Sequence, residues 1–321
     1  MGHESDWQPR ASLATLRLRA ALLAQVRAFF AKRDFLEVET PLLGHAGAAD
    51  AQLAQFLIED PVHGPLYLQT SPEYAMKRLL IAGSGSIFQI TKAFRQGEVG
   101  ARHNPEFTII EWYALGYNDE RLRKEVCALI SELLPHLEKT PRTVSFSDAF
   151  KNAIGVDPFK DRTDHLRQCV YTLIPSAQHL RLDMRDDMLD LLMSQAVAPQ
   201  FSDRHLTVIT DYPASQAALA RVRSDGLADR FEVYCGGLEL ANGFYEAATP
   251  AQYADRFAEE ARRRRERGLV AIPADERLLA ALSDRPLPDC AGVAVGFDRL
   301  VMLAIEALHI NATLAFAIDR A

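Results

Sequence analysis

The spacing of apolar residues changes several times along the chain, and each change predicts a different kind of element. Residues 13–34 place apolar side chains at helical intervals and predict an amphipathic helix. Residues 35–43 are typical of a short strand, which Pro41 restricts to a strand end or a sheet edge. Two longer alternating stretches, 86–96 and 106–117, predict strands joined by a polar loop. This part of the chain therefore predicts a helix followed by a hairpin.

Helical patterns become more frequent towards the middle of the chain. Residues 65–83 predict a strand, a turn and a helix, with Ser71 as the helix cap and Pro72 in its first turn. Residues 119–139 predict another helix, and about 140–205 a mainly helical insertion. Further strands are predicted at 206–214, 231–235, 238–247 and 292–296, and further helices at 250–267 and 298–308. Hairpins and separate helices together predict a mostly antiparallel sheet in an α+β domain.

Composition narrows the class of protein. The 321 residues can bury a sizeable core, and 48% hydrophobic with 25% charged residues is ordinary for a soluble globular chain. The 36 basic and 43 acidic residues give a net charge of −7, so no overall positive field favours nucleic acid. The chain has no long apolar run and no apolar leader, which predicts a cytoplasmic protein without a membrane segment. With no repeat or long linker, residues 1–321 are predicted to form a single domain.

The remaining compositional features predict no metal cluster and no basic binding patch. The four cysteines include no CxxC pair, which predicts reduced thiols rather than a zinc site. The basic run 262–268 follows acidic residues one turn away, so it is expected to be a solvated helix face.

The hairpin 86–117 carries the first candidate chemistry. Strand alternation places Glu111 and Tyr113 on one face, where a carboxyl group beside a phenol can receive a cationic amine. Arg95 ends the first strand, and its fork of donors suits a carboxylate or a phosphate. These side chains also fit the charged rim of an ordinary hairpin, so spacing alone leaves both interpretations open.

A second predicted hairpin carries two carboxylates. Gly236–Gly237 is a strong signal for a two-residue turn, which places Tyr234 opposite Glu239 and Glu232 opposite Ala241. Glu232 and Glu239 then share a face as diagonal neighbours. A magnesium ion shared with phosphates would relieve their repulsion, whereas a solvent-facing pair would need no ion.

Glu246 needs a backbone irregularity to join that face. Strict alternation turns its side chain away from the side chain of Glu239. A bulge at 242–243 would re-aim it, because a bulge adds one residue to one strand.

The third candidate lies at residues 292–303. Asp298 is expected to cap the last helix, which leaves Arg299 beside the positive helix end, a natural phosphate site. Gly292 and Gly296 bracket the preceding strand and allow a close approach to the backbone, or else a tight packing contact.

Taken together, these segments resemble the catalytic core of the class II aminoacyl-tRNA synthetases. "FLEVETPLL" resembles the first motif of that family, "FRQGEV…RHNPEFTIIEWY" the second, and "GVAVGFDRLVML" the third. "ELANGFYE" and "SPEYAMKRLL" resemble the lysine-specific branch. The resemblance covers nearly the whole chain in family order. It implies a six-stranded antiparallel sheet flanked by helices, and a homodimer formed through the first motif.

The resemblance also implies a role for each matching residue. Arg95 and Arg299 would hold the α- and γ-phosphates of a bent ATP, and Glu232 and Glu239 would bind Mg²⁺. The implied catalytic residues are Arg95, Arg299 and Glu239. The implied nucleotide-binding residues are Arg95, Gln96, Gly97, Glu98, Asn104, Glu239, Leu240, Gly296 and Arg299. The implied amino-acid-binding residues are Ser71, Pro72, Glu73, Glu111, Tyr113, Asn242, Glu246 and Ala294.

Two positions depart from the synthetase pattern. The family reads Arg-Asn-Glu where this chain has Arg95 to Glu98, which leaves the adenine contact either to Glu98 or to the backbone. Lysyl-tRNA synthetases tend to have glycine at the position of Ala294. An added methyl group would crowd an α-amino group and favour a shifted one, as in β-lysine.

The acceptor is suggested by what the chain lacks. A complete lysyl-tRNA synthetase carries an amino-terminal OB-fold of on the order of 100 residues for the anticodon, and the first predicted helix begins too early for one. The shortened pattern resembles the elongation factor P–lysine ligases, which pass lysine, or preferably (R)-β-lysine, to a lysine side chain of that factor. The acidic chain makes tRNA a less favoured partner.

Three alternatives remain beside the ligase. A minimal lysyl-tRNA synthetase that acylates tRNA without an anticodon domain ranks second. An amidotransferase that uses ammonia should carry an arginine for an aspartate side chain, whereas this pocket offers Glu111 and Glu246. A regulatory paralogue without activity typically loses the phosphate-binding arginines or magnesium carboxylates, and this chain keeps both.

Overall fold

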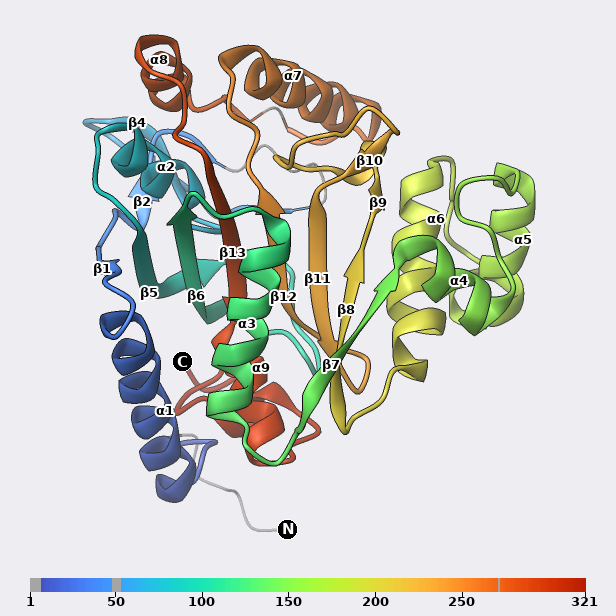
Figure 1. The fold of residues 1–321 in the computed structure, drawn as a ribbon, viewed down its shortest axis with the longest axis horizontal. Helices are drawn as coiled ribbons and strands as arrows, with labels where there is room; N and C mark the ends of the chain where they lie inside the picture. The colour runs from blue at the N-terminus through green and yellow to red at the C-terminus, as the bar shows by residue number, and fades with distance from the viewer. Residues whose placement is uncertain (1–6, 48–52, 271) are drawn as a thin grey trace. The chain divides into compact units, whose positions relative to one another are not determined.

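The computed structural model describes residues 7–47, 53–270 and 272–321, and the chain divides into two compact units. The first unit consists of Met1–Tyr117, Glu132–Leu134 and Glu246–Ala321. The second unit consists of Asn118–Ser131 and Pro135–Tyr245. Figure 1 shows the strands and helices of each unit by label and colour. The organisation of residues 1–321 as a single domain stays a prediction.

Four strands of the main sheet form the centre of the first unit, in the order β1-β5-β6-β13. They are β1 (Leu36–Glu37), β5 (Ile87–Phe94), β6 (Glu106–Leu115) and β13 (Cys290–Gly296). β1 runs parallel to β5, whereas β6 is antiparallel to both β5 and β13. The helices of this unit are α1 (Leu13–Ala31), α2 (Glu73–Ile81), α7 (Pro250–Glu266), α8 (Glu276–Asp284), α9 (Phe297–Ala304) and the short η5 (Ile310–Thr313). A separate sheet has the order β2-β4-β3, with β2 (Leu43–Gly44), β4 (Gly64–Leu68) and β3 (Leu57–Asp60).

Aromatic side chains join α1 to the strands of the first unit. Val26 and Phe30 lie on the buried face of α1, as the apolar spacing predicts. Phe30 stacks on Phe88 of β5, with 4.4 Å between the ring centroids, and meets Trp112 of β6 edge-on at 5.1 Å. Such pairs stabilise a core by more than their buried area alone. Because strand residues alternate, this packing leaves the other face of β5 and β6 for polar groups.

The second unit has its own four main-sheet strands, in the order β12-β11-β8-β7. They are β12 (Leu238–Tyr245), β11 (Arg230–Cys235), β8 (His205–Thr210) and β7 (Glu138–Ser145), and β7 runs parallel to β8. The unit also holds most of α3 (Asp119–Leu133), a β9 (Tyr212–Pro213)–β10 (Leu227–Ala228) pair, and the helices α4 (Phe146–Ile154), α5 (Thr163–Leu173) and α6 (Arg185–Leu192). Short helical turns occupy Pro175–Ala177, Met193–Val197, Ala198–Gln200 and Ala214–Gln216. Phe146, Phe150 and Tyr212 lie at the centre of its core.

The α+β class with helices around strands is confirmed, but the expected sheet of six antiparallel strands is wrong. The two units supply four main-sheet strands each, eight in all. The β1–β5 and β7–β8 pairs are parallel, so the strands are mixed in direction.

The apolar pattern does not predict β7, β3 or α8. β7 lies wholly in residues expected to be helical, at the end of the predicted helix 119–139 and the start of the insertion, and its mostly exposed polar side chains show no apolar alternation. The helical region therefore begins at Phe146 and not at about 140. α8 buries only Leu278 and Leu282, one turn apart, which is too short an apolar pattern to stand out.

The two-residue turn between β11 and β12 forms as predicted. Gly236 and Gly237 both adopt positive φ angles, 54° and 73°, which glycine tolerates without the steric cost of a Cβ atom. Tyr234 lies opposite Glu239, again as predicted.

Beyond that pair, the register differs from the prediction. Glu232 lies opposite Asn242 and not opposite Ala241, because Leu240 is an extra residue in β12. The bulge therefore lies at Leu240, not at 242–243, and it turns the Asn242 side chain to the face that carries Glu232.

The basic run 262–268 is only partly the solvated face that the sequence predicts. Arg262 pairs with Glu259 one turn earlier, as expected. Arg264 is buried, and its Nε donates a hydrogen bond to the backbone carbonyl of Val270. One arginine of the run therefore serves the local fold.

The cysteines are free thiols, as predicted, and they are Cys127, Cys169, Cys235 and Cys290. Within the part of the chain that the structure describes, no helix is both long and apolar enough to pass through a bilayer.

Candidate active site

A buried carboxyl group lies at the centre of the polar face of β6. Glu111 is only 2% exposed, and its two oxygens accept hydrogen bonds from neutral hydroxyl groups. Ser71 Oγ donates to Oε2 at 2.7 Å, and the Tyr113 hydroxyl donates to Oε1 at 2.8 Å. Burial, together with the nearby charge of Glu73, raises the pKa of Glu111 to about 8. The predicted pair of Glu111 and Tyr113 is therefore confirmed as a contact.

Ser71 connects the start of α2 to this carboxyl group. Its Oγ accepts a hydrogen bond from the backbone N–H of Glu73 at 3.1 Å while it donates to Glu111. The N-cap position belongs to the buried Pro72, so the predicted placement of Pro72 inside the first turn is wrong by one residue. The single hydroxyl group thus fixes both the helix start and the carboxyl group.

Lys77 is a site residue that the sequence analysis missed. Its side chain is fully buried, and its Nζ lies 2.7 Å from Glu73 Oε1 and 2.7 Å from Glu246 Oε2. Burial by itself lowers the pKa of Lys77, but the charges of Glu246 and Glu73 raise it well above its ordinary value. The spacing of Glu73 and Lys77, one helical turn apart, could have indicated an ion pair from the sequence. The second partner, Glu246, is distant in the sequence, so no spacing indicated that contact.

Small residues of β13 make room for these groups. Gly292 lies opposite Tyr113 in the register of β13 and β6, and Ala294 lies opposite Glu111. A Cβ atom at Gly292 would come within 2.3 Å of the Tyr113 ring and 2.5 Å of Glu246 Oε1. Of the two alternatives left open for Gly292, the structure shows the tight packing contact, with side chains of the protein itself. We call the group of Ser71, Glu73, Lys77, Glu111, Tyr113, Glu246 and Gly292 the amine pocket.

Two arginines of the first unit border the loop 97–105. Arg95 is partly buried, lies 5.0 Å from the Phe107 ring centroid and 3.7 Å from Glu98. Arg299 Nη2 lies 2.8 Å from His103 Nε2. Burial and the adjacent Arg299 charge lower the pKa of His103, which leaves that imidazole neutral at pH 7. Both guanidinium groups thus stand beside the loop 97–105, and their phosphate contacts stay a prediction.

Asp298 does not cap α9, contrary to the prediction. The N-cap residue is Gly296, and no side chain caps this helix end. The buried Asp298 carboxylate instead accepts a hydrogen bond from the Thr108 backbone N–H at 2.8 Å and pairs with Arg19 at 2.5 Å. This contact ties the start of α9, and with it Arg299, to β6.

Other predicted nucleotide-binding residues occupy the loop and its neighbours. Gln96 and Gly97 are exposed, and Gly97 has a positive φ of 82°. Asn104 is buried, its amide donates to the Glu106 carbonyl at 2.6 Å, and its oxygen accepts from the Ile318 N–H at 3.0 Å. The Asn104 side chain therefore organises backbone, and a direct nucleotide contact stays a prediction.

The carboxylate pair predicted to bind Mg²⁺ belongs to the second unit. Glu232 is 6% exposed and accepts hydrogen bonds from the hydroxyl groups of Tyr212 at 2.6 Å and Tyr234 at 2.5 Å. Arg230 pairs with its other oxygen at 2.5 Å, and Arg230 Nε also donates to Asn242 Oδ1 at 3.3 Å. The charge of Glu232 is therefore already compensated.

The donor set fits an ion that takes few ligands from the protein. No group of three or more His, Cys, Asp or Glu side chains poised around a metal position occurs among the described residues. Glu239 is partly exposed across from Tyr234, whereas Leu240 is buried in the bulge. Mg²⁺ commonly binds one or two carboxylates together with phosphate oxygens, so two carboxylates are enough in number, and the binding of Mg²⁺ by Glu239 and Glu232 stays a prediction.

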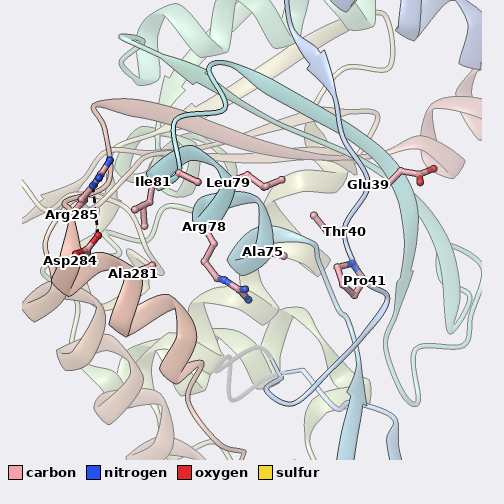
Figure 2. A pocket seen from close by; sticks show the side chains of 11 residues that line it. Glu39, Thr40, Pro41, Ala75, Arg78, Leu79, Ile81, Ala281, Asp284 and Arg285 are labelled. Carbon is pink, nitrogen blue, oxygen red and sulfur yellow. Dashed lines mark ion pairs between the residues drawn. The ribbon is translucent and has the colours of Figure 1, made fainter.

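A cavity of about 660 Å³ lies beside α2 (Figure 2). It is lined by Glu39, Thr40, Pro41, Ala75, Arg78, Leu79, Ile81, Ala82, Ala281, Asp284 and Arg285. None of the predicted site residues, all of which the structure describes, lines this cavity. Lys77 and Arg78 are neighbours in α2, yet only Arg78 reaches it. The cavity is therefore not the candidate active site.

The sequence of the chain can now be compared with those of known proteins. The family model of class II tRNA synthetases (D, K and N) matches residues 5–320. A protein of Vibrio cholerae serotype O1 named "Elongation factor P--(R)-beta-lysine ligase" is 45% identical over 99% of both chains. Proteins of the same name from Salmonella gallinarum and Salmonella dublin are 43% and 42% identical over 100% of both chains. The chain therefore belongs to the family of class II tRNA synthetases (D, K and N).

Proposed function

We propose that the protein activates (R)-β-lysine, or lysine, with ATP as the aminoacyl-adenylate and transfers it to a lysine side chain of elongation factor P. The protein would then be an ATP-dependent, AMP-forming ligase. The observation that carries the proposal is identity of 42–45% over the full length of relatives named for this activity. The amine pocket supports it, because a buried carboxyl group with hydroxyl neighbours suits an ammonium group.

The chemistry needs positioning and charge, and no protein nucleophile. The carboxylate of the amino acid attacks the α-phosphorus of ATP, and pyrophosphate leaves. The side-chain amine of the acceptor lysine then attacks the carbonyl carbon of the adenylate, loses a proton, and AMP leaves. Arg95 would neutralise charge on the α-phosphate and Arg299 charge on the γ-phosphate. The Asp298 contact to β6 supports the second role, because it fixes the helix that carries Arg299.

The proposed Mg²⁺ ligands are Glu239 and Glu232. A bound Mg²⁺ would supply charge neutralisation on the phosphates. Arg230, Tyr212 and Tyr234 hold Glu232 in one orientation, and Glu239 lies opposite Tyr234 in the neighbouring strand.

The other proposed contacts divide into those to the amino acid and those to the nucleotide. Ser71, Pro72, Glu73, Glu111, Tyr113, Asn242, Glu246 and Ala294 would bind the amino acid. Gln96, Gly97, Glu98, Asn104, Leu240 and Gly296 would surround the nucleotide. Glu98 already faces Arg95, which supports a role for it beside the phosphates more than beside the adenine.

A cytoplasmic homodimer formed through the first motif completes the proposal. Exposed apolar residues support this interface: Leu36 at 54%, Leu42 at 40%, Leu43 at 38%, Leu57 at 48% and Ile58 at 40% exposure. They lie in or beside β1, β2 and β3, and such a concentration is typical of a surface that another chain covers.

A transfer assay tests the proposal against the tRNA alternative. Purified protein is incubated with ATP, Mg²⁺, labelled lysine, total tRNA and elongation factor P, and the precipitable label is treated with ribonuclease or protease. Loss of label to protease, and no labelling by an Arg95→Ala variant, is the expected result. Loss to ribonuclease would identify a minimal lysyl-tRNA synthetase and contradict the proposal.

A further inference from the structure

The amine pocket contains an ammonium group that belongs to the protein. Lys77 Nζ lies 2.7 Å from Glu73 Oε1 and 2.7 Å from Glu246 Oε2, and the lysine is completely enclosed. It also lies 5.8 Å from the Tyr113 ring centroid and 5.2 Å from that of Tyr253. A buried lysine needs compensating charge, and here two carboxylates share one cation.

Glu111 differs from these two carboxylates in its partners. Its oxygens accept hydrogen bonds from Ser71 and Tyr113, which are neutral. The pocket thus holds three carboxyl groups and one internal ammonium group, whose described ion pairs are with Glu73 and Glu246. When all three carboxyl groups are ionised, the pocket carries a net charge of two negative units.

We propose that Lys77 is the positioning residue that sets the charge of the amine pocket, compensating one of the two negative charges of Glu73 and Glu246 so that Glu111 alone loses a proton when a diamino acid binds. This inference rests on the proposed function, which it deepens. It assigns a proton, which leaves Glu111 when a substrate ammonium group arrives.

The proton assignment follows from the surroundings of each group. The pKa of Glu111 is raised to about 8 by burial, so the empty pocket holds this carboxyl group neutral at pH 7. A cation at hydrogen-bond distance favours the ionised form and releases the proton. Glu73 and Glu246 each lie 2.7 Å from the Lys77 ammonium, whereas the described hydrogen bonds of Glu111 come from neutral hydroxyl groups, so the proton is assigned to Glu111.

Removal of Lys77 should change the number of protons released on ligand binding. Glu246 is buried and the Glu73 side chain is 23% exposed, and both face the point that Lys77 Nζ occupies. Without a cation the two carboxylates repel each other there, so we expect one of them to take up a proton in the empty pocket of the variant. The titratable groups around this point are Glu73 and Lys77 of α2, Glu111 and Tyr113 of β6, Tyr253 of α7, and Glu246. None of the others is a cation that could replace Lys77.

Isothermal titration calorimetry in two buffers of different ionisation enthalpy measures the protons released when lysine or (R)-β-lysine binds. Lys77→Met, a change of similar volume, should release about one proton more per ligand than the wild type at pH 7. It should also bind about tenfold or more weakly at pH 7, and the loss should shrink as the pH rises. The double variant Lys77→Met with Glu73→Gln removes one charge of each sign and should restore the wild-type proton count.

The outcomes separate this inference from the proposed function. Equal proton counts in the wild type and in Lys77→Met would overturn the inference, whereas lysine binding by the wild type would leave the proposed function standing. Wild-type protein that binds neither diamino acid would contradict the proposed function itself. If Lys77→Met does not fold, the double variant decides, because a count above that of the wild type would contradict the charge assignment.

Discussion

Gly292→Ala is the substitution for which the structure gives the sharpest expectation. The added methyl carbon would lie 2.3 Å from a ring carbon of Tyr113 and 2.5 Å from Glu246 Oε1, where ordinary contacts between such atoms are about 3.5–4.0 Å. Neither neighbour can move freely, because Tyr113 is 2% exposed and Glu246 1%. Glu246 is also held by Lys77.

The magnitude follows from overpacking. Extra methyl groups in a packed interior cost about 1–3 kcal/mol, here divided between the stability of the fold and the shape of the amine pocket. If the pocket takes the whole cost, the KM for lysine rises between about fivefold and 150-fold. If the fold takes it, the melting temperature falls by a few degrees.

ATP–pyrophosphate exchange with lysine, together with thermal unfolding, measures both parts. Gly44→Ala is the matched control, because the same methyl group there would meet only one atom, a backbone oxygen at an ordinary 3.8 Å. The control should leave the KM for lysine unchanged, because Gly44 is not part of the amine pocket; its melting temperature is read with that of the wild type, since β2 belongs to the proposed dimer interface. A Gly292→Ala protein with wild-type KM and wild-type melting temperature would refute the close packing of Tyr113 and Glu246 on β13.

Three further changes test separate parts of the site. Ala294→Gly removes the methyl group opposite Glu111 and should raise exchange activity with α-lysine relative to β-lysine by about tenfold; an unchanged ratio would remove Ala294 as the selector. Glu239→Ala should abolish exchange while the unfolding free energy stays within about 0.5 kcal/mol, because the residue is partly exposed, and retained exchange would make the carboxylate pair structural. Glu111→Gln tests the pH dependence of stability. The folded-state pKa of Glu111, about 8, lies above its ordinary value of 4.5. Between these two pH values the folded protein keeps a proton that the unfolded chain has lost. The contribution of Glu111 to stability therefore falls as the pH rises from about 4.5 to about 8. Urea unfolding should show the wild type losing stability relative to Glu111→Gln across that window, and parallel curves would mean that Glu111 is ionised in the folded state.

Local patterns in the sequence determined the elements that carry the site. Period-two alternation placed Glu111 and Tyr113 on one face of β6, and two adjacent glycines placed Tyr234 opposite Glu239. These features depend on residues a few positions apart, whose geometry the backbone fixes by itself. The resemblance to class II synthetases, carried by the same segments, is confirmed by the family match.

Tertiary structure decided the partners of the charged groups. Asp298 could have capped its own helix, yet its buried carboxylate serves the Thr108 backbone on another strand. The extra residue Leu240 shifts the register of β12. The sequence suggested a bulge two residues further on, at 242–243, and not at Leu240. Lys77 lies close to Glu73 in the sequence but depends equally on Glu246, far along the chain. A buried charge must find compensation wherever the fold brings an opposite charge, and that choice is made only when distant segments pack together.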